Sequence, residues 1–184
     1  RLIREIHGVL MRGNRAGDKQ FGEFRRSQNW IGGTRPGNAV YVPPPPDRLM
    51  ECLGPLEIFL HDEKVPLPVL VRAALAHVQF ESIPPFLDGN GRLGRLLITF
   101  MLCATGVLRS PILYLSLYLK SHRAAYYDQL QLVRERGVWD GWLDFFLNGV
   151  AETAEQATDA AEQILDLFEE DRVRIGALKG AAGT

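Results

Sequence analysis

This sequence of 184 residues lacks any apolar run long enough to cross a membrane. Its longest strongly apolar run, Ile112–Leu119, falls well short of the roughly 18 residues that a spanning helix needs. It has only two cysteines, Cys52 and Cys103, which form no C-x-x-C pair; this excludes a disulfide framework or a zinc site and is typical of a cytoplasmic protein. We therefore expect a cytoplasmic chain with no membrane partner.

The sequence also lacks an excess of charge of one sign. Its formal net charge is −1, so no global field draws the protein towards nucleic acid, and we expect no direct nucleic-acid contact from this segment. What is present is the composition of one ordinary globular domain, with 46% hydrophobic and 23% charged residues.

Apolar residues at helical spacing predict an all-α fold. The expected helices are Arg1–Arg12, Arg48–His61, Pro66 to about Phe80, Arg92 to about Thr105, and at least three pieces between Ile112 and Lys179, broken near Ser121 and at Gly137 and Gly141. The one convincing β signal is Ile31–Val42, where glycine, proline and asparagine are followed by β-branched and aromatic residues, so we predict a β-hairpin there.

Four consecutive prolines, Pro43–Pro46, must adopt an extended polyproline II conformation because they have no backbone N–H to donate. Such a segment is either a ligand for a recognition module or a stiff strut between the hairpin and the following helix. We favour the strut.

The chemical signal lies in the stretch 80–95, a glycine-rich turn that opens directly into a helix. Gly89 and Gly91 allow positive φ, so the backbone N–H groups of the turn can form an anion-binding nest. The helix N-terminus adds unpaired N–H groups and the positive end of its dipole. The turn therefore predicts a site for an anion.

Three charged side chains extend this site. Arg92 and Arg95 are three positions apart, so both guanidinium groups lie on one face of the first helical turn and can bind phosphate oxygens. Asp88 places a carboxylate just before the nest, suited to a Mg²⁺ ion that bridges those phosphates. Taken separately these elements are common, as a surface turn and two solvated arginines; together they indicate a polyphosphate site.

The same stretch resembles the signature of the Fic family, H-P-F-x-D-G-N-G-R-x-x-R. The matching residues are Pro85, Phe86, Asp88, Gly89, Asn90, Gly91, Arg92 and Arg95. Further resemblance covers nearly the whole chain, at Glu5–His7, Gly32–Val40, Pro43–Pro46, Leu113–Ser116, Tyr126–Tyr127 and Trp142–Phe146. The resemblance implies a single Fic-fold helical domain over residues 1–184, with N-terminal helices and a flap in about 1–65, a core in 66–150 that holds the motif 84–95, and a C-terminal helix and tail in 151–184.

The resemblance implies a protein adenylyltransferase, which moves AMP from ATP to a hydroxyl group of an unidentified target protein. Asp88 would bind Mg²⁺, and the phosphates would lie on Gly89, Asn90, Gly91, Arg92, Gly94 and Arg95. Tyr126, Tyr127 and the neighbourhood of Arg134 resemble positions near the adenine. The flap that aligns the target would comprise Gly37, Asn38, Ala39, Val40 and Tyr41.

One departure decides the predicted activity: Pro84 stands where the family has histidine. That histidine takes the proton of the attacking hydroxyl, and losing a positioned general base costs on the order of 10²–10⁴-fold in rate. We expect no substitute, because His77 belongs to the core or a helix surface and Glu81 should point along the helix end. The chain is therefore predicted to bind Mg-ATP and to transfer AMP poorly.

Two further interpretations remain open. The alternative is a nucleotide-binding pseudoenzyme that acts as a protein-interaction module and forms no covalent product. A regulator that reads nucleic acid is a weaker third hypothesis. Thr158–Glu162 resembles the inhibitory [S/T]-x-x-x-E-[G/N] motif of the family, with Gln163 in place of its last residue. The resemblance is compatible with a homodimer, although the sequence contains no exposed stripe that demands one.

Overall fold

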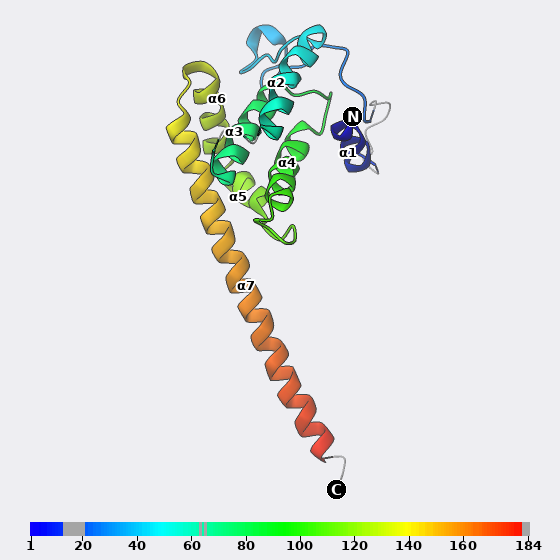
Figure 1. Cartoon of the computed structure of the whole chain (residues 1–184), viewed down its shortest axis with the longest axis vertical. Coiled ribbons are helices and arrows are strands. Elements are labelled where there is room, and N and C mark those ends of the chain that lie inside the picture. Colours follow the sequence, from blue (N-terminus) through cyan, green and yellow to red (C-terminus); the bar gives the residue numbers. More distant parts are fainter. Residues whose placement is uncertain (13–20, 63, 65, 182–184) are drawn as a thin grey trace.

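The computed structural model describes residues 1–12, 21–62, 64 and 66–181, and they form an all-α domain (Figure 1). Its helices are α1 (Leu2–Leu10), α2 (Leu49–His61), α3 (Val69–Ser82), α4 (Asn90–Ala104), α5 (Leu115–Ser121), α6 (Arg123–Arg136) and α7 (Trp139–Ala181). Two 3₁₀ turns, Pro36–Asn38 and Pro46–Arg48, lie between α1 and α2. The predicted tail beyond residue 181 lies outside the described residues.

Helix α3 runs through the centre of the body and divides the core in two. On one side, Ala73 and Ala74 pack in a cluster with residues of α4 to α7, and the Trp142 indole donates to the Ala74 carbonyl at 3.0 Å. On the other side, Ala76 and Phe80 pack with α2, α4 and the motif loop. Fully buried alanines bring the backbone of α3 close to its neighbours, so this helix can position residues on both sides.

The predicted breaks near Ser121 and at Gly137 are confirmed, but the break at Gly141 is wrong. α6 ends at Gly137, which has φ of 65°, whereas α7 runs through Gly141 without interruption. A Cβ atom at Gly141 would lie 2.7 Å from the Gln129 side chain. Glycine at this position therefore serves the close approach of α6 to α7 and does not end the helix.

The predicted hairpin at Ile31–Val42 is not confirmed. The described residues contain one isolated antiparallel bridge, Ile31 to Tyr41, in its place. Gly32 and Gly33 have φ of 70° and 68°, so the chain turns away from the ladder directly after Ile31. The tip is then held by Asn38, whose Oδ1 accepts from two backbone N–H groups. The flap is thus a loop closed by one bridge.

The extended part of the proline segment is Pro43–Pro45, which packs as the expected strut; the prediction of an extended conformation is wrong for Pro46, which begins the 3₁₀ turn Pro46–Arg48. The Pro43 carbonyl accepts from Gln28 at 2.9 Å, and the Pro44 carbonyl accepts from Arg25. These bonds fasten the segment between the flap and α2.

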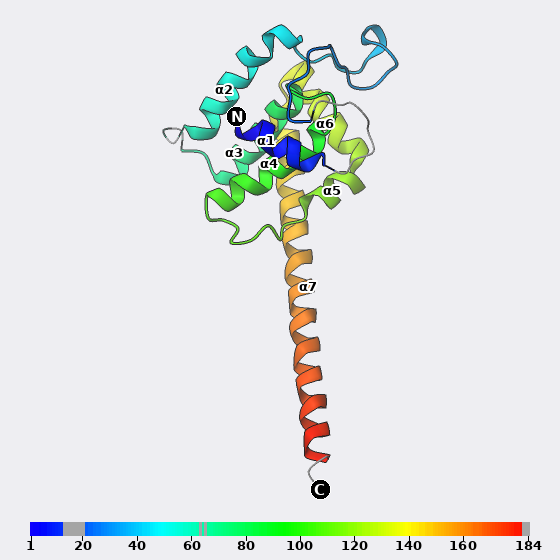
Figure 2. The ribbon, with the colours of Figure 1, turned by 90° about the vertical axis from the view of Figure 1, so that its right-hand side faces the viewer.

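Helix α7 gives the molecule its shape. Its first part packs on the body, down to the buried Thr153, and the rest projects as a single stem (Figures 1 and 2). Every described side chain after Thr158 on this stem is exposed. Thr158 and Glu162 lie on this projection, so the motif Thr158–Glu162 is not placed to block a site in the body. Among the helices that the structure describes, none has the length and apolar character needed to cross a bilayer.

Candidate active site

The loop between α3 and α4 is shaped by its own side chains. Gly89 has φ of 79°, a left-handed conformation that favours glycine, and α4 begins at the next residue. Asn90 folds back on the loop: its Oδ1 accepts from the Phe86 N–H at 2.9 Å, and its Nδ2 donates to the Phe86 carbonyl at 2.7 Å. Gly91 was expected to share the positive φ, but it lies inside α4, so the turn depends on Gly89 alone.

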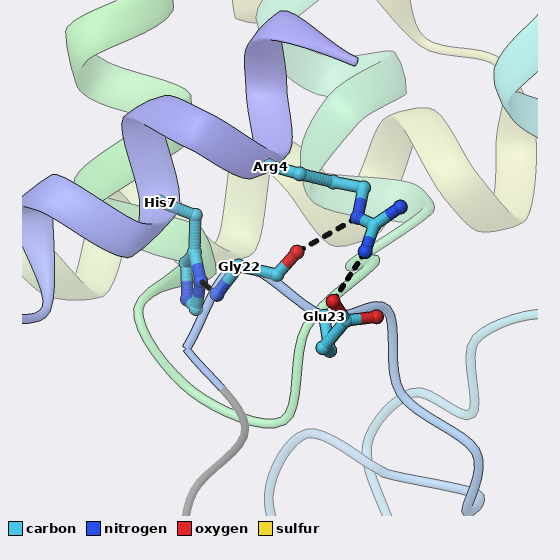
Figure 3. A network of polar contacts seen from close by, with 4 residues as sticks. All are labelled: Arg4, His7, Gly22 and Glu23. Carbon is cyan, nitrogen blue, oxygen red and sulfur yellow. Dashed lines mark hydrogen bonds and ion pairs between the residues drawn. The ribbon is translucent and has the colours of Figure 1, made fainter.

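His7 of α1 holds this loop from outside, and Figure 3 shows its contact with Gly22. The Gly22 N–H donates to His7 Nδ1 at 2.9 Å, so the remaining proton is on Nε2, which donates to the Asp88 carbonyl at 2.9 Å. The ring also stacks on Phe86, with centroids 3.7 Å apart. Burial is the main cause that lowers the pKa of His7, so it stays neutral and keeps one donor and one acceptor.

The contacts around this clamp reach the next segment of the chain. Arg4 donates from Nε to the Gly22 carbonyl at 2.8 Å and forms an ion pair with Glu23, as Figure 3 shows. α1 is therefore tied both to residues 22–23 and to the motif loop. Sequence reasoning noted His7 only as part of a resemblance and missed this positioning role.

Pro84 is buried, and its carbonyl is held by Arg25. The Arg25 Nε donates to the Pro84 carbonyl at 2.9 Å, and the Arg25 backbone N–H donates to the Pro85 carbonyl at 2.9 Å. The guanidinium also binds the Pro44 and Ser27 carbonyls, and only 3% of the residue is exposed. Position 84 is thus firmly fixed but carries no group that can accept a proton.

A cavity of about 620 Å³ opens beside the start of α4. Both motif arginines, Arg92 and Arg95, line it, together with Tyr126 and Tyr127 of α6. Gly94 is buried on the other side of α4, against Phe80 and Glu81, and does not line the cavity. Of the predicted phosphate-binding residues, Arg92 and Arg95 share this space with the two tyrosines, whereas Gly89, Asn90 and Gly91 do not line it and Gly94 is a packing residue.

The cavity is more basic than the sequence analysis predicted. Lys120 and Arg123 line it beside the two motif arginines, and none of its described lining residues is acidic. Arg123 lies over the Tyr127 ring, 5.5 Å from its centroid. Four cations around one cavity, in a chain of net charge −1, create a strong local preference for a polyanion. Lys120 and Arg123 were missed because they lie on different elements from the motif.

Asp88 is the one candidate metal ligand that the motif supplies. The part of the chain that the structure describes contains no cluster of three or more His, Cys, Asp or Glu side chains that could hold an ion. Mg²⁺ is commonly bound by one or two carboxylates together with substrate phosphates, so the single carboxylate of Asp88 fits such an ion, and Asp88 itself is not among the residues that line the cavity. Asp88 Oδ1 also accepts from the Gly89 N–H at 2.7 Å, which orients the carboxylate.

His77 is a core residue, as expected, and not a substitute base. It is fully buried, and its Nδ1 donates to the Gly94 carbonyl at 3.0 Å because a carbonyl can only accept. Nε2 therefore accepts from the Tyr126 hydroxyl at 2.8 Å. Desolvation lowers the pKa of His77 to about 4, so the imidazole stays neutral and orients Tyr126 at the cavity wall.

Glu81 points towards α4 and away from the flap. A Cβ atom at Gly94 would lie 2.3 Å from Glu81 Oε1, which places this oxygen against the first turns of α4. Oε1 has no hydrogen-bond partner, and only 8% of the residue is exposed. Desolvation raises the pKa of Glu81 to about 7, against the opposing effect of Arg95 and Arg134. A buried carboxyl group with a raised pKa therefore lies against the first turns of α4.

Arg134 does not line the cavity; it holds the flap. It donates to the Glu81 carbonyl at 2.8 Å and to Ser82 Oγ at 3.2 Å, and its guanidinium lies over the Tyr41 ring at 4.3 Å. The Tyr41 hydroxyl donates to the Ser82 carbonyl at 2.8 Å. On the same side, Gln131 donates to the Val40 carbonyl at 3.1 Å. α6 thereby joins the flap to the end of α3.

The five predicted flap residues differ in exposure. Gly37 and Asn38 form an exposed turn, Ala39 and Tyr41 are half-buried, and Val40 is 63% exposed. The Val40 and Tyr41 N–H groups both donate inward to the Ile31 carbonyl. The exposed side chain of Val40 is therefore carried on a backbone that is already hydrogen-bonded.

The sequence profile of the Fic/DOC family matches residues 1–102, which is more than half of the chain. The chain belongs to the Fic/DOC family. This Fic domain is 36% identical over 148 residues to the protein adenylyltransferase Fic of Aedes aegypti and to that of Culex quinquefasciatus. The match covers 80% of this chain and 25% of each mosquito protein.

Solved structures agree with the Fic fold. A Fic family protein from Desulfovibrio desulfuricans superposes with a TM-score of 0.72 at 27% identity, over 86% of this chain and 46% of that one. Fic-1 from C. elegans superposes with a TM-score of 0.61 at 24% identity, over 88% of this chain and 43% of that one, and so shares the fold. The Fic domain described here spans about a quarter to a half of the length of these proteins.

Proposed function

We propose that this Fic domain binds Mg-ATP in the basic cavity and that Pro84 leaves it a strongly impaired protein adenylyltransferase. The observation that supports the proposal is the convergence of Arg92, Arg95, Lys120 and Arg123 on one cavity without an acidic neighbour among its described lining residues. A nucleoside triphosphate carries the negative charge that such a cavity selects. Relatives at 36% identity are named as protein adenylyltransferases.

In this proposal the residues of α4 hold the triphosphate. Arg92 and Arg95 bind the outer phosphates. Asp88 and those phosphates would hold Mg²⁺, which would neutralise the charge that develops on the leaving pyrophosphate. Tyr126 and Tyr127 line the part of the cavity assigned to the nucleoside. The flap around Val40 would place a hydroxyl of the target protein beside the α-phosphorus.

AMP transfer forms a bond from the target hydroxyl oxygen to the α-phosphorus and breaks the bond between that phosphorus and the oxygen that leaves with pyrophosphate. The hydroxyl proton must pass to a base as this happens, because a neutral hydroxyl is a weak nucleophile. Pro84 has no atom that can take the proton, while Glu81 points into α4 and His77 is buried on Tyr126. Transfer is therefore expected to be slower by about 10²–10⁴-fold than with a positioned base.

The deciding experiment measures intact-protein mass after incubation with ATP and Mg²⁺, with a panel of candidate target proteins present. The wild type, Pro84→His and Pro84→Ala are compared, because the alanine variant changes the backbone without supplying an imidazole. We expect adenylylated product only with Pro84→His. Equal product from the alanine variant would show that the rigidity of proline, and not the missing base, limits the reaction.

ATP binding is tested separately by calorimetry. We expect Mg²⁺-dependent binding by the wild type and a large loss of affinity in Arg95→Ala. Arg109→Ala, which removes a charge outside the cavity lining, serves as the control. Unchanged affinity in Arg95→Ala would overturn the assignment of the cavity to the triphosphate.

The alternative is a pseudoenzyme that binds nucleotide and a partner without transfer. The contact between Arg25 and the Pro84 carbonyl favours it, because the loop keeps its position without any catalytic group at residue 84. Nucleotide binding with no product from Pro84→His, on any target, would support this alternative.

A further inference from the structure

The projecting part of α7 exposes an apolar stripe that the body of the protein does not cover. Ile164, Leu165, Leu167 and Phe168 are between 52% and 66% exposed, and Ile175 is 54% exposed. Apolar side chains of this size on a solitary helix leave its hydrophobic face without a partner. The sequence analysis found no exposed stripe that demands a dimer, and the structure now shows exposed apolar side chains on this helix.

The spacing of the stripe identifies the kind of partner. From Val150 onward, small or apolar residues recur at alternating intervals of four and three: Val150, Ala154, Ala157, Ala161, Ile164, Phe168 and Ile175, with Asp171 the single exception. This is the heptad pattern in which alternate core positions face a second helix. A heptad seam on a solvated stem, interrupted at Asp171, indicates that the stem pairs with another helix along its length.

We infer that the stem pairs with the stem of a second copy of this chain, as an antiparallel coiled coil centred on residue 166. In that register Ile164 of one copy packs on Phe168 of the other, and Ala157 packs on Ile175. The Asp171 carboxylate lies opposite the small Ala161 side chain, so no large apolar group encloses it. The inference does not depend on the proposed function.

Two apolar residues beside the seam select the antiparallel orientation. Leu165 and Leu167 flank the seam on its two sides. In an antiparallel pair centred on residue 166, flanking residues on the same side meet, so Leu165 packs beside Leu165 of the second copy and Leu167 packs beside Leu167. In a parallel pair with the same seam, Leu167 would instead face Arg172 of the second copy. Only the antiparallel pair buries both leucines against apolar side chains.

Charge along the stem favours the same orientation. Residues 151–171 contain eight acidic side chains and no basic one, whereas Arg172 and Arg174 follow directly. An antiparallel pair places Arg172 opposite Thr158, which Glu155 and Glu162 flank on the helix surface. A parallel pair would align the two acidic stretches side by side. Arg172 and Arg174 form exposed ion pairs within their own helix, which are easily exchanged.

The length of the stem is compatible with this pairing. The body contacts end near Thr153, and in the proposed register residue 154 of one copy lies opposite residue 178 of the other. The overlap is 25 residues by this count, roughly 37 Å of helix at 1.5 Å per residue. In this register the two bodies lie at opposite ends of the paired helices.

The first test is sedimentation equilibrium of the full chain between 1 and 100 μM protein. We expect a dimer of twice 20.6 kDa for the wild type. Phe168→Glu should weaken the dimer by roughly 100-fold or more, because a charge would enter the seam of both copies. Gln163→Glu adds the same charge on the outer face of the stem and should leave the dimer intact. A monomeric wild type, or a dimer that survives Phe168→Glu, overturns the inference.

The second test fixes the orientation by disulfide formation with oxidised glutathione. In a background with Cys52→Ala and Cys103→Ala, the single variants Ile164→Cys and Phe168→Cys are mixed. We expect the mixture to form the mixed disulfide, and Phe168→Cys alone to form little. Efficient crosslinking of Phe168→Cys with itself would indicate a parallel pair and overturn the antiparallel register. Circular dichroism checks that each variant keeps the helical fold.

Discussion

Among the acidic side chains that the structure describes, Glu81 is the one whose pKa the fold shifts most. One oxygen of its buried carboxyl group has no hydrogen-bond partner, and the charges of Arg95 and Arg134 only partly offset the effect of desolvation on its pKa. Tyr126 is the other titratable group that faces it, and burial raises the pKa of that hydroxyl as well. A buried acid in these surroundings must affect stability as the pH changes.

We predict that Glu81→Gln stabilises the domain at alkaline pH relative to the wild type. The native carboxyl has a pKa of about 7, against 4.5 for an ordinary glutamate, so the native state binds more protons than the unfolded chain in that window. The wild type therefore loses stability as pH rises from 4.5 through 7, by on the order of 1–3 kcal/mol, and the variant does not. Urea denaturation at pH 4.5, 6 and 8 measures this, and parallel pH profiles for both proteins would contradict it.

Gly94 is a second residue whose role is set by close approach. A Cβ atom there would lie 2.3 Å from Glu81 Oε1 and 3.1 Å from the Phe80 ring. We predict that Gly94→Ala lowers the free energy of unfolding by on the order of 1–3 kcal/mol, because the core must shift to admit the methyl group. Gly54→Ala is the control: nothing lies within 4 Å of that position in α2, so the change should be neutral or stabilising. Thermal melts compare the two.

At the scale of elements, α1 acts as a clamp on the motif loop. Its His7 side chain joins residue 22 to residue 88 through one accepted and one donated hydrogen bond, and it stacks on Phe86. Arg25 performs a comparable function from the next segment by binding the Pro84 carbonyl. Both ends of the loop are therefore positioned by N-terminal residues that contribute nothing to the cavity lining.

We predict that His7→Ala destabilises the domain by on the order of 2–4 kcal/mol, because it removes a buried ring and leaves the Gly22 N–H without its acceptor. Amide hydrogen exchange should also accelerate in residues 86–91. His61→Ala, at the exposed end of α2, should change stability by only about 0.5 kcal/mol or less. Unchanged exchange in the loop would show that α1 does not position it.

At the scale of the whole molecule, the body and the stem have separate sources of stability. The body closes around fully buried side chains such as Trp142 and Phe146 at the start of α7. The stem beyond residue 157 adds no buried side chain to that core in the described residues. Isolated helices are marginal in water, which is a further reason to expect that the stem gains stability from a partner.

We predict that a chain ending at residue 157 keeps a folded body with a melting temperature within a few degrees of the full chain, while it loses helical signal and dimerisation. Trp142→Ala, in contrast, should cost about 3–5 kcal/mol, because it empties the centre of the core. Circular dichroism melts and sedimentation measure both. An unfolded body in the truncated chain would show that the stem is part of the domain core.

Several helix ends and the turn of the motif loop were determined by the sequence itself. Apolar spacing and glycine punctuation act over a few residues, so the ends of α2 and α6 and the turn at Gly89 follow from local sterics. The match to the Fic signature likewise used contiguous residues, and the family assignment agrees with it.

The tertiary structure decided what local patterns could not. Gly141 stays helical because α6 packs against it, and Gly91 stays helical because α4 begins one residue earlier. Arg134 was expected near the adenine and instead holds the flap, and His7 acts on a loop 81 positions away. Such roles depend on which segments meet in space. Burial and long-range hydrogen bonding determine that, and the spacing of residues along the chain does not record it.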